Sequence, residues 1–482
     1  MSKMSRNILL VEPNYRTKFP PLGLMKISSY HKQLGDQVQF VKGISQKVAY
    51  EYWDRIYVTT LFTYNWKVTV DTILHYKKLV SGDLSRLFVG GIMASLEPET
   101  LWQETGVVPK TGVLNYRNAL DEDNDLIVDE MLPDYELFDD INHNYSLLAD
   151  CYFGYSTRGC VHKCDFCGVH RLEPKFIEYQ GLKPYIQAIN ERYGEKAHLI
   201  LFDNNILASR KFDQVIADIL DLGFHKGAKF GPTRKQRRLD FNQGTDARLM
   251  TEHHVELLSK TAINPLRIAF DSIRYKVLYC EKVKLAAKYG IRNLSNYILY
   301  NHNDTPEDFW ERLKINIDLN RDYGLKIYSF PMKYIPLNAK DRTYVDEPNW
   351  NWYFIRNIQR ILNVMKGSVM TGEEFFYRAF GANKEEFRTI LHMPERILMF
   401  RKHEPQAEEK DWLRKFHALT SSERDELITI LANNRTKATL QKAYAGLSSK
   451  SLREILEYYV PEPASAPLLK CLKEPHNEGL TV

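Results

Sequence analysis

The sequence lacks long hydrophobic runs. Its first apolar run, at residues 7–11, is too short for the core of a signal peptide, and no stretch approaches the roughly 20 residues that span a bilayer. A strong charge of one sign is also missing, since 66 Lys and Arg residues against 61 Asp and Glu residues leave a formal net charge of only +5. This balance allows an anionic partner without requiring one. We therefore expect a cytoplasmic protein that makes no membrane contact.

Cysteine is scarce as well, with six residues in 482. Cys151, Cys280 and Cys471 are scattered and form no disulfide framework, which favours a reducing compartment. The remaining composition, 44% hydrophobic and 26% charged, is typical of a globular chain, and the length predicts two or three domains.

The other three cysteines stand close together. Cys160, Cys164 and Cys167 follow one another with three and then two residues between them. An iron–sulfur cluster normally uses four cysteines, so a cluster held by three would leave one iron open for chemistry. Structural zinc is an alternative, with His162 or His170 as a fourth ligand, although the paired halves of a zinc module are missing. In a third interpretation, the cysteines bind nothing and pack only as small hydrophobic side chains.

Residues 1–140 alternate short apolar runs with longer amphipathic ones. Strands are predicted at 7–11, 38–41, 55–60 and 86–89, and helices at 22–34 and 68–79. This alternation predicts an open, mostly parallel sheet. Gly90 and Gly91, directly after a strand, mark a sharp turn or a close approach of the backbone.

Residues 150–332 repeat the alternation more regularly. Six strands are predicted, at 152–157, 198–202, 239–243, 266–270, 292–300 and 325–330, with helices at 182–193, 212–220, 252–259, 277–289 and 306–323 between them. Six such units in about 180 residues fit an incomplete (β/α)6 barrel. The three cysteines then lie in the loop after its first strand.

The spacing C-x3-C-x2-C, with Phe166 before the last cysteine, resembles the signature of the radical S-adenosylmethionine (radical SAM) superfamily. The resemblance implies that Cys160, Cys164 and Cys167 hold a [4Fe–4S] cluster within a partial barrel. It implies that the open iron binds the amino and carboxylate groups of S-adenosylmethionine (SAM), with Phe166 near the adenine. Reductive cleavage of SAM would need a reductant such as flavodoxin or ferredoxin, and would yield a 5′-deoxyadenosyl radical that abstracts hydrogen from an unactivated position.

The N-terminal segment resembles the cobalamin-binding (B12-binding) domain that precedes many radical SAM barrels. The resemblance rests on 20–24 (PPLGL), 89–91 (VGG) and 132–135 (LPDY). The Asp-x-His-x-x-Gly motif, whose histidine can ligate cobalt, is absent, and the histidines between residues 1 and 140 are His31 and His75. Two alternatives stay open: a domain that binds cobalamin and supports methyl transfer to carbon, or a domain that only covers the barrel.

Polar residues stand where the predicted barrel strands end, at the edge that lines the active site of parallel βα barrels. The candidates are Asp203, Asn204 and Asn205 after the second strand, Asp246 and Arg248 after the third, and Asp271 and Ser272 after the fourth. Arg248 offers a fork of donors to the SAM carboxylate, and Asp203, Asp246 and Asp271 offer acceptors to the ribose hydroxyls. Residues 203–205 stand where the family often carries a Gly-Gly-Glu-like element that binds the amino group. Helix capping is the alternative, above all for Ser272 and Asp304.

The chain changes character after the barrel. Residues 341–460 are predicted to be mostly helical, with capping boxes at Thr371–Glu374 and Thr420–Glu423, and the proline-rich segment 461–482 is predicted to be a flexible tail. The densest basic run, 226–238, is predicted to be a solvated loop. A nucleic-acid footprint would require this basic surface to continue on the C-terminal helices, where Arg435, Lys437 and Lys442 stand.

The sequence thus predicts an α/β enzyme in four parts: a Rossmann-like cobalamin-binding-type domain at 1–140, a radical SAM partial barrel at 150–340, a helical region at 341–460 and the tail. Its substrate, whether small molecule, peptide or nucleic acid, carries no recognisable signature. Two alternatives to the general prediction stay open. One is radical modification of a nucleic-acid base, and the other is a zinc-binding nucleic-acid or scaffold protein.

Overall fold

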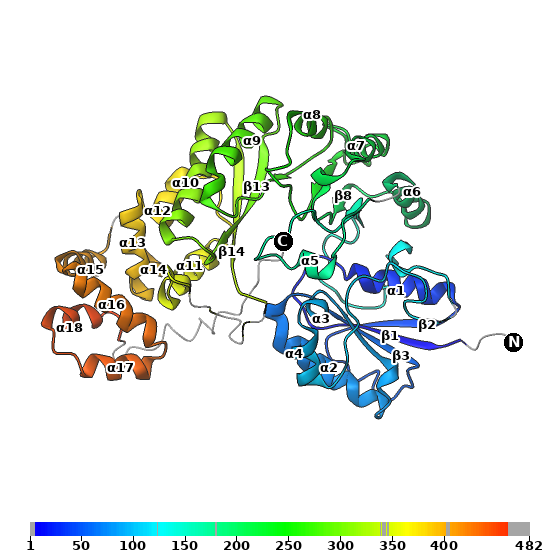
Figure 1. Ribbon diagram of the computed structural model, residues 1–482, viewed down its shortest axis with the longest axis horizontal. Coiled ribbons are helices and arrows are strands. Elements are labelled where there is room, and N and C mark those ends of the chain that lie inside the picture. Colours follow the sequence, from blue (N-terminus) through cyan, green and yellow to red (C-terminus); the bar gives the residue numbers. More distant parts are fainter. Residues whose placement is uncertain are drawn as a thin grey trace. The chain divides into compact units, whose positions relative to one another are not determined.

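The computed structural model describes residues 5–122, 124–178, 181–337, 339, 344, 347–401 and 405–460, which form two compact units (Figure 1). Unit 1 comprises the chain up to Arg267 together with Tyr289–Ile291, and unit 2 comprises Ile268–Lys288 and the chain from Arg292 onward. The predicted tail, 461–482, lies outside the described residues. The predicted domain boundaries stay a prediction.

Unit 1 begins with a four-stranded parallel sheet in the order β2-β1-β3-β4. Helices follow the strands along the chain, as the alternation predicted. The elements are β1 (Asn7–Glu12), α1 (Leu22–Gln33), β2 (Gln37–Lys42), β3 (Arg55–Thr60), α2 (Trp66–Lys77), β4 (Leu87–Gly91), α3 (Ile92–Leu96) and α4 (Pro98–Thr105). The Rossmann-like N-terminal sheet is confirmed.

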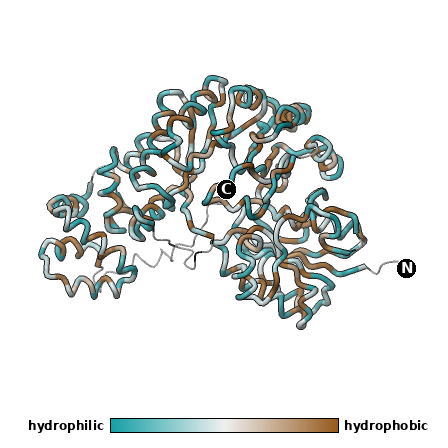
Figure 2. Tube along the Cα trace, in the orientation of Figure 1, coloured by the Kyte–Doolittle hydropathy of each residue, from teal (hydrophilic) through white to brown (hydrophobic). Residues whose placement is uncertain are grey.

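Hydrophobic strands hold this sheet between its helices. Successive side chains of a strand point to opposite faces, so Leu9 and Val11 of β1 share one face and pack in the same core as Ile73 of α2. Ile8 and Leu10 point to the other face, and all four β1 side chains are fully buried. Figure 2 shows hydrophobic colouring along these strands. Burial on both faces is typical of parallel sheets that are covered on both sides.

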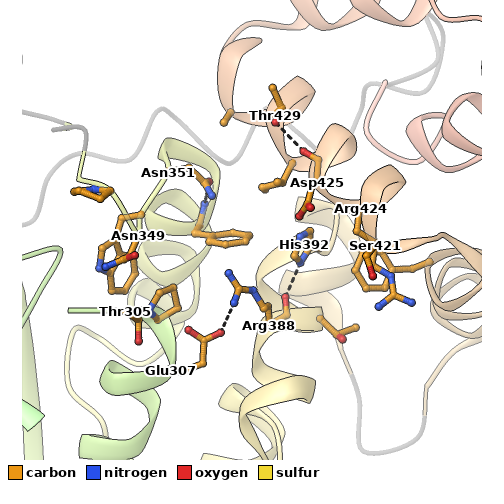
Figure 3. Close-up of a pocket in the computed structure, with 18 of the residues that line it drawn as sticks. Thr305, Glu307, Asn349, Asn351, Arg388, His392, Ser421, Arg424, Asp425 and Thr429 are labelled. Carbon is orange, nitrogen blue, oxygen red and sulfur yellow. Dashed lines mark hydrogen bonds and ion pairs between the residues drawn. The ribbon is translucent and has the colours of Figure 1, made fainter. Parts of the chain in front are cut away.

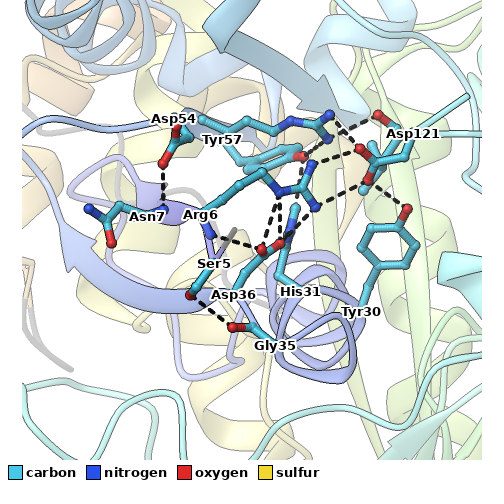
Figure 4. A network of polar contacts seen from close by, with 12 residues as sticks. Ser5, Arg6, Asn7, Tyr30, His31, Gly35, Asp36, Asp54, Tyr57 and Asp121 are labelled. Carbon is cyan, nitrogen blue, oxygen red and sulfur yellow. Dashed lines mark hydrogen bonds and ion pairs between the residues drawn. The ribbon is translucent and has the colours of Figure 1, made fainter. Parts of the chain in front are cut away.

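A partly buried network of charges connects the amino ends of the strands (Figure 4). Arg6, just before β1, pairs with Asp36, just before β2, and with Asp121, each at 2.7 Å. Arg55, the first residue of β3, reaches Asp121 at 2.6 Å, and the Tyr30 hydroxyl donates to the same carboxylate at 2.8 Å. Each buried charge has a partner, so the network lowers the cost of burying these groups.

His31 of α1 belongs to this network and is fully buried. Its Nδ1 lies 2.7 Å from Asp36 Oδ2, and its Nε2 lies 3.0 Å from the Tyr57 hydroxyl. Burial lowers the pKa of His31 to about 4, against the hydrogen bond to Asp36, which raises it. Both ring nitrogens are therefore engaged in the protein interior, at the amino edge of the sheet.

The lowered pKa of His31 predicts acid sensitivity. The unfolded chain takes up the imidazole proton near pH 6.5, so the neutral form stabilises the fold above that pH and this stabilisation is lost as the pH falls toward 4. We expect the free energy of unfolding to fall by roughly 2–3 kcal/mol in this window through His31. Denaturant unfolding at pH 7 and pH 4.5 measures the loss.

The matched variant is His31→Gln, because the glutamine amide offers a hydrogen-bond donor and an acceptor in place of the ring nitrogens and does not titrate. It should show a shallower pH dependence than the natural protein. His392 in unit 2 also has its pKa lowered to about 4 by burial, so only the difference between the two proteins reports on His31. Identical pH dependences would contradict the prediction.

The second half of unit 1 carries a parallel sheet in the order β11-β8-β5. Thr245 N–H donates to the Arg267 carbonyl at 2.8 Å, beside the short fourth strand. The elements are β5 (Cys151–Gly154), α6 (Leu182–Tyr193), β8 (His198–Leu201), α7 (Phe212–Asp221), β9 (Lys229–Phe230), β10 (Lys235–Gln236), β11 (Arg238–Phe241), α8 (Glu252–Lys260) and β12 (Leu266–Arg267).

Unit 2 opens with two long parallel strands, β13 (Asn293–Tyr300) and β14 (Lys326–Lys333). The N–H groups of Ile268 and Phe270 donate to the carbonyls of Ser295 and Tyr297, at 2.9 and 3.1 Å, and extend this ladder. α9 (Lys276–Lys288) and α10 (Pro306–Tyr323) follow the strands as predicted. All six strands predicted for the partial barrel are therefore present, and the fourth, predicted at 266–270, is shared between the units because its first two residues form β12 in unit 1 and Ile268 and Phe270 bond in unit 2.

The rest of unit 2 is helical, as predicted, around a core that includes Trp412, Phe376 and Phe387. The helices are α11 (Trp352–Val364), α12 (Glu373–Phe380), α13 (Lys384–His392), α14 (Glu395–Phe400), α15 (Ala407–Ala418), α16 (Ser421–Asn433), α17 (Lys437–Ala445) and α18 (Lys450–Leu456). Short 3-10 turns occur in both units. They lie at Thr63–Asn65, Lys78–Val80, Leu84–Arg86, Val128–Glu130 and Ile206–Ala208 in unit 1 and at Ile273–Tyr275 in unit 2. Among the described residues, no helix has the length and apolar character of a membrane span.

One of the two predicted capping boxes is confirmed. Thr420 and Glu423 cap the amino end of α16 reciprocally. The prediction at Thr371–Glu374 is wrong, because α12 begins at Glu373 and Gly372 occupies its cap position with no side-chain hydrogen bond. A threonine one residue too early cannot reach the free N–H groups of the first turn.

Candidate active site

Two short strands close the base of the cysteine loop. β6 (Thr157–Arg158) pairs antiparallel with β7 (Ile177–Glu178), and we call this two-stranded pair the clip. Residues 159–176, which include the three cysteines and α5 (Val169–Leu172), therefore leave and return at one place beyond the carboxyl end of β5. In parallel βα folds this is the edge where binding and catalytic residues gather.

Gly159, immediately before Cys160, adopts a conformation that favours glycine. Its φ is +73°, and a Cβ atom there would stand 2.3 Å from the carbonyl oxygen of Lys175. The Gly159 N–H donates to Glu173 Oε2 at 2.6 Å. The first residue of the loop thus turns tightly against its last residues, which only a residue without a side chain permits.

Glu173 holds three parts of the site together. Its carboxylate accepts from Arg158 Nη1 at 3.0 Å, from Gly159 N–H at 2.6 Å and from Asn204 Nδ2 at 2.9 Å, and the residue is only 6% exposed. These donors come from the clip, from the start of the cysteine loop and from the end of β8. We call this arrangement the Glu173 clamp. The sequence offered no signal for it, because its partners lie 14–31 residues away along the chain.

Buried charges continue from the clamp into the N-terminal sheet. Arg158 also binds Asp129 through Nη2, and its guanidinium lies 3.5 Å from the centroid of the Tyr155 ring. Asp129 Oδ1 in turn lies 3.2 Å from Nζ of Lys26, a buried residue of α1. One chain of alternating charges thus connects the cysteine loop to the helix that follows β1.

The three cysteines are free thiols and partly exposed. Cys160 Sγ accepts from the His162 N–H and from Asn205 Nδ2, both at 3.4 Å, and Cys164 Sγ lies 3.8 Å from Arg248 Nη2. Among the described residues, no group of three or more His, Cys, Asp and Glu side chains converges as ligands of one metal ion would. The thiols on one loop, with N–H donors aimed at two sulfurs, have the donor chemistry that suits an iron–sulfur cluster.

Asn205 carries a buried acceptor that none of the described residues satisfies. While its Nδ2 reaches Cys160 Sγ, its Oδ1 has no hydrogen-bond partner in the described part of the chain. Unpaired buried polar atoms are rare in folded proteins and call for a ligand or a solvent molecule. The position is beside the first cysteine, so a ligand of the cysteine loop could supply the missing donor.

Asp203, by contrast, has its acceptors engaged inside the protein. Its carboxylate is fully buried and accepts from the backbone N–H and hydroxyl groups of both Ser156 and Thr157. Burial raises the pKa of Asp203 against these donors, which lower it. This geometry favours a role in fixing the chain between β5 and the clip over the predicted contact with a ribose.

Asp246 and Arg248 meet the cysteine loop at the end of β11. Arg248 holds Asp246 as a fork, Nε to Oδ1 at 2.9 Å and Nη2 to Oδ2 at 2.7 Å. His162 Nε2 lies 3.1 Å from Asp246 Oδ2, a distance that suits an ion pair although the angle is not that of a hydrogen bond. Both predicted site residues therefore meet the cysteine loop, Arg248 at Cys164 and Asp246 at His162.

The other predicted residues lie in different places. Phe166 is half-buried in the turn between Cys164 and Cys167. Asp271 and Ser272 belong to unit 2, where the Asp271 carbonyl accepts from Arg312 at 2.9 Å and Ser272 caps a 3-10 turn through Arg274 N–H. Capping, the alternative for Ser272, is thus observed. For Asp304 it is wrong, because Thr305 caps α10.

The carboxyl edge of the N-terminal sheet adjoins the cysteine loop within unit 1. α3, which begins after Gly91 at the end of β4, lies against α5, and a Cβ atom on Gly168 would stand 2.9 Å from Leu96 Cδ2. Gly91 has φ +110°, and its Cβ would stand 2.4 Å from the Thr60 carbonyl. Both glycines therefore permit close packing at this edge, as the Gly90–Gly91 pair indicated.

The basic segment 226–238 forms a short antiparallel hairpin of β9 and β10, where a loop was predicted. Lys235 Nζ pairs with Asp150 at 2.6 Å, and Arg237, which is mostly buried, pairs with Glu195. Acidic partners thus neutralise part of its charge. The hairpin precedes β11 and so lies at the amino end of that strand.

A separate hollow of about 840 Å³ lies in unit 2 between α11, α13 and α16 (Figure 3). Phe354 and Phe416 contribute aromatic surface to it, and Arg388 pairs with Glu307 at 2.7 Å across its wall. Its charged lining residues balance, with Arg388, Arg424 and Arg435 against Glu307, Glu385 and Asp425. The hollow therefore does not continue a basic surface that would bind nucleic acid.

Comparisons with known proteins found likeness only among solved structures. No protein-family model and no curated protein matches the chain. It is similar to TsrM from Kitasatospora setae, a radical SAM methyltransferase solved with cobalamin and a [4Fe–4S] cluster, at 14% identity over 68% of this chain and 72% of that one, with a TM-score of 0.48. It is also similar to SuiB from Streptococcus suis bound to the precursor peptide SuiA, at 12% identity over 52% and 54%, with a TM-score of 0.31.

Structures of the radical SAM methyltransferase TsrM are thus among those that the chain resembles. At such identities the likeness concerns the path of the chain. The roles inferred for the site residues rest on the distances and contacts within this structure.

Proposed function

We propose that this protein is a radical SAM enzyme in which Cys160, Cys164 and Cys167 hold a [4Fe–4S] cluster. The observation that carries the proposal is the cysteine loop closed by β6 and β7, which brings three thiols beyond the carboxyl end of β5 and places N–H donors at Cys160 and Cys164. When bound, a cluster of this kind and SAM supply an adenosyl radical that abstracts hydrogen from the substrate. The reductant would be a one-electron donor of the flavodoxin or ferredoxin class.

The residues around the loop have the chemistry to receive SAM. Asn205 Oδ1, a buried acceptor beside Cys160, suits the donors of the SAM amino group. Phe166 offers an aromatic surface for the adenine from the turn between the second and third cysteines. The Glu173 clamp keeps Asn204, and through it the end of β8, against the start of the loop. These side chains would bind and orient SAM.

We further propose that the reaction of this enzyme is a cobalamin-dependent methyl transfer. The carboxyl edge of a Rossmann-like sheet is the usual ligand edge of this fold, and here it adjoins the cysteine loop within one unit. His31 and His75 lie toward the ends of α1 and α2, which return to the amino edge, so neither is placed to ligate cobalt from this sheet. Neither His31 nor His75 would then hold cobalamin through its cobalt.

Anaerobic purification followed by reconstitution tests the proposal. We expect a brown protein with about four iron and four sulfide per chain, which converts SAM to 5′-deoxyadenosine when reduced. Product analysis with and without hydroxocobalamin separates the finer alternatives: S-adenosylhomocysteine formed only with cobalamin supports methyl transfer. A colourless protein that carries zinc would refute the proposal.

A further inference from the structure

Arg248 is held in one orientation at the edge of the cysteine loop. Its Nε and Nη2 form a two-point contact with the Asp246 carboxylate, at 2.9 and 2.7 Å, and the Arg248 backbone N–H donates to the same carboxylate at 2.9 Å. A planar guanidinium gripped at two points cannot rotate freely. The same Nη2 lies 3.8 Å from Cys164 Sγ, so the fixed cation presents a donor to a sulfur atom.

The anchor is itself tied to the loop. Asp246 Oδ2 also faces His162 Nε2 at 3.1 Å, and His162 stands between Cys160 and Cys164 in the chain. The Asp246 side chain is only 13% exposed, and that of Arg248 is 34% exposed. The contacts therefore close a ring from the loop to the end of β11 and back to the loop, which keeps the guanidinium at Cys164 although part of it meets solvent.

We propose that Arg248, positioned by Asp246, donates a hydrogen bond to the Cys164 thiolate and raises the reduction potential of the iron–sulfur cluster. This inference rests on the proposed function. Reduction by an external one-electron donor adds one negative charge to the cluster and its thiolates. A cation with an N–H at the sulfur stabilises the reduced form more than the oxidised form. Asp246 has no proton for the sulfur, so it acts through the arginine as a positioning residue.

The proposal differs from the role expected from sequence, in which Arg248 binds the carboxylate of SAM. A carboxylate-binding arginine affects SAM affinity and leaves the potential measured without SAM unchanged. An arginine on the cluster thiolate shifts that potential whether or not SAM is present. The potential of the reconstituted protein in the absence of SAM is therefore the measurement that separates the two roles.

The test is a redox titration of reconstituted Arg248→Gln, monitored by electron paramagnetic resonance of the reduced cluster. We expect about a tenfold loss in the equilibrium constant for reduction, a shift of about 59 mV toward more negative potential for a one-electron couple. Arg248→Lys keeps the positive charge but not the two-point contact with Asp246. Its reduction potential should therefore lie between those of the natural protein and Arg248→Gln. Arg171→Gln is the matched control, because this exposed arginine lies on α5 in the same loop.

The iron content and the reduction potential of the variants together decide whether the proposal holds. A natural-like iron content with a shifted potential in Arg248→Gln and none in Arg171→Gln supports the proposal. A natural-like iron content with an unchanged potential overturns it, and a loss confined to SAM affinity assigns the carboxylate role instead. If Arg248→Gln holds no cluster, the potential of Arg248→Lys decides in the same way. A natural protein that binds no iron refutes the proposed function itself.

Discussion

Replacing Cys160, Cys164 or Cys167 by alanine should remove the iron–sulfur cluster and with it every turnover of SAM. A cluster held by three thiolates loses a third of its protein ligands in each variant. Replacing residues that merely hold a metal ligand in place typically costs 10–100-fold in metal affinity. We expect a direct ligand to cost more than about 100-fold on that scale. Iron and sulfide analysis after identical anaerobic reconstitution measures the loss.

Cys280→Ala is the matched control for this series. Cys280 is a free thiol of intermediate exposure on α9, outside the cysteine loop, so its variant should retain iron, colour and SAM cleavage at the natural level. Equal loss in Cys280→Ala and the loop variants would mean that the assay reports general thiol chemistry. Full iron content in any of the three loop variants would remove that cysteine from the proposed ligand set.

The Glu173→Gln variant should fold and yet hold its cluster poorly. An amide of the same shape keeps part of the hydrogen bonding, but it removes the charge that Arg158 faces and turns a donor toward at least one existing donor. The start of the cysteine loop and Asn204 then lose their common anchor. We expect roughly tenfold faster loss of iron to a chelator, within the range for residues that hold metal ligands in place.

Thermal unfolding and a control separate this effect from general damage. Leaving buried donors unpaired costs about 1–3 kcal/mol each, so Glu173→Ala should lower the melting temperature more than Glu173→Gln does. Glu195→Gln removes a half-exposed carboxylate from Arg237, away from the loop, and should leave iron retention unchanged. Natural iron retention in Glu173→Gln would show that the clamp does not position the cluster.

Much of the architecture follows from local patterns. The β1 run NILLVE is short, apolar and bounded by polar residues, and it forms a buried strand at its predicted place. α10 carries a proline in its first turn, a capping threonine before it and Gly324 after it, and it begins and ends where the pattern predicted. The cysteine loop could be placed because it directly follows the first strand of the barrel.

The site itself was only partly predictable. Asp246 and Arg248 could be predicted as neighbours because only one residue separates them after a strand, but the contact of Arg248 with Cys164 joins residues that are 84 positions apart. Asp203 has the same residue type and the same strand-end position, yet it turns inward to Ser156 and Thr157, which no spacing reveals. Glu173 could not be predicted as a site residue, because a lone glutamate in a loop usually faces solvent.

The most direct test of the central claim is electron paramagnetic resonance of the reconstituted, reduced protein before and after addition of SAM. A cluster held by Cys160, Cys164 and Cys167 with one open iron predicts a signal from the reduced protein that changes on SAM binding. The same change should be absent from the Cys164→Ala variant. A reduced cluster whose signal is identical with and without SAM, or a protein that shows no such signal, would contradict the account.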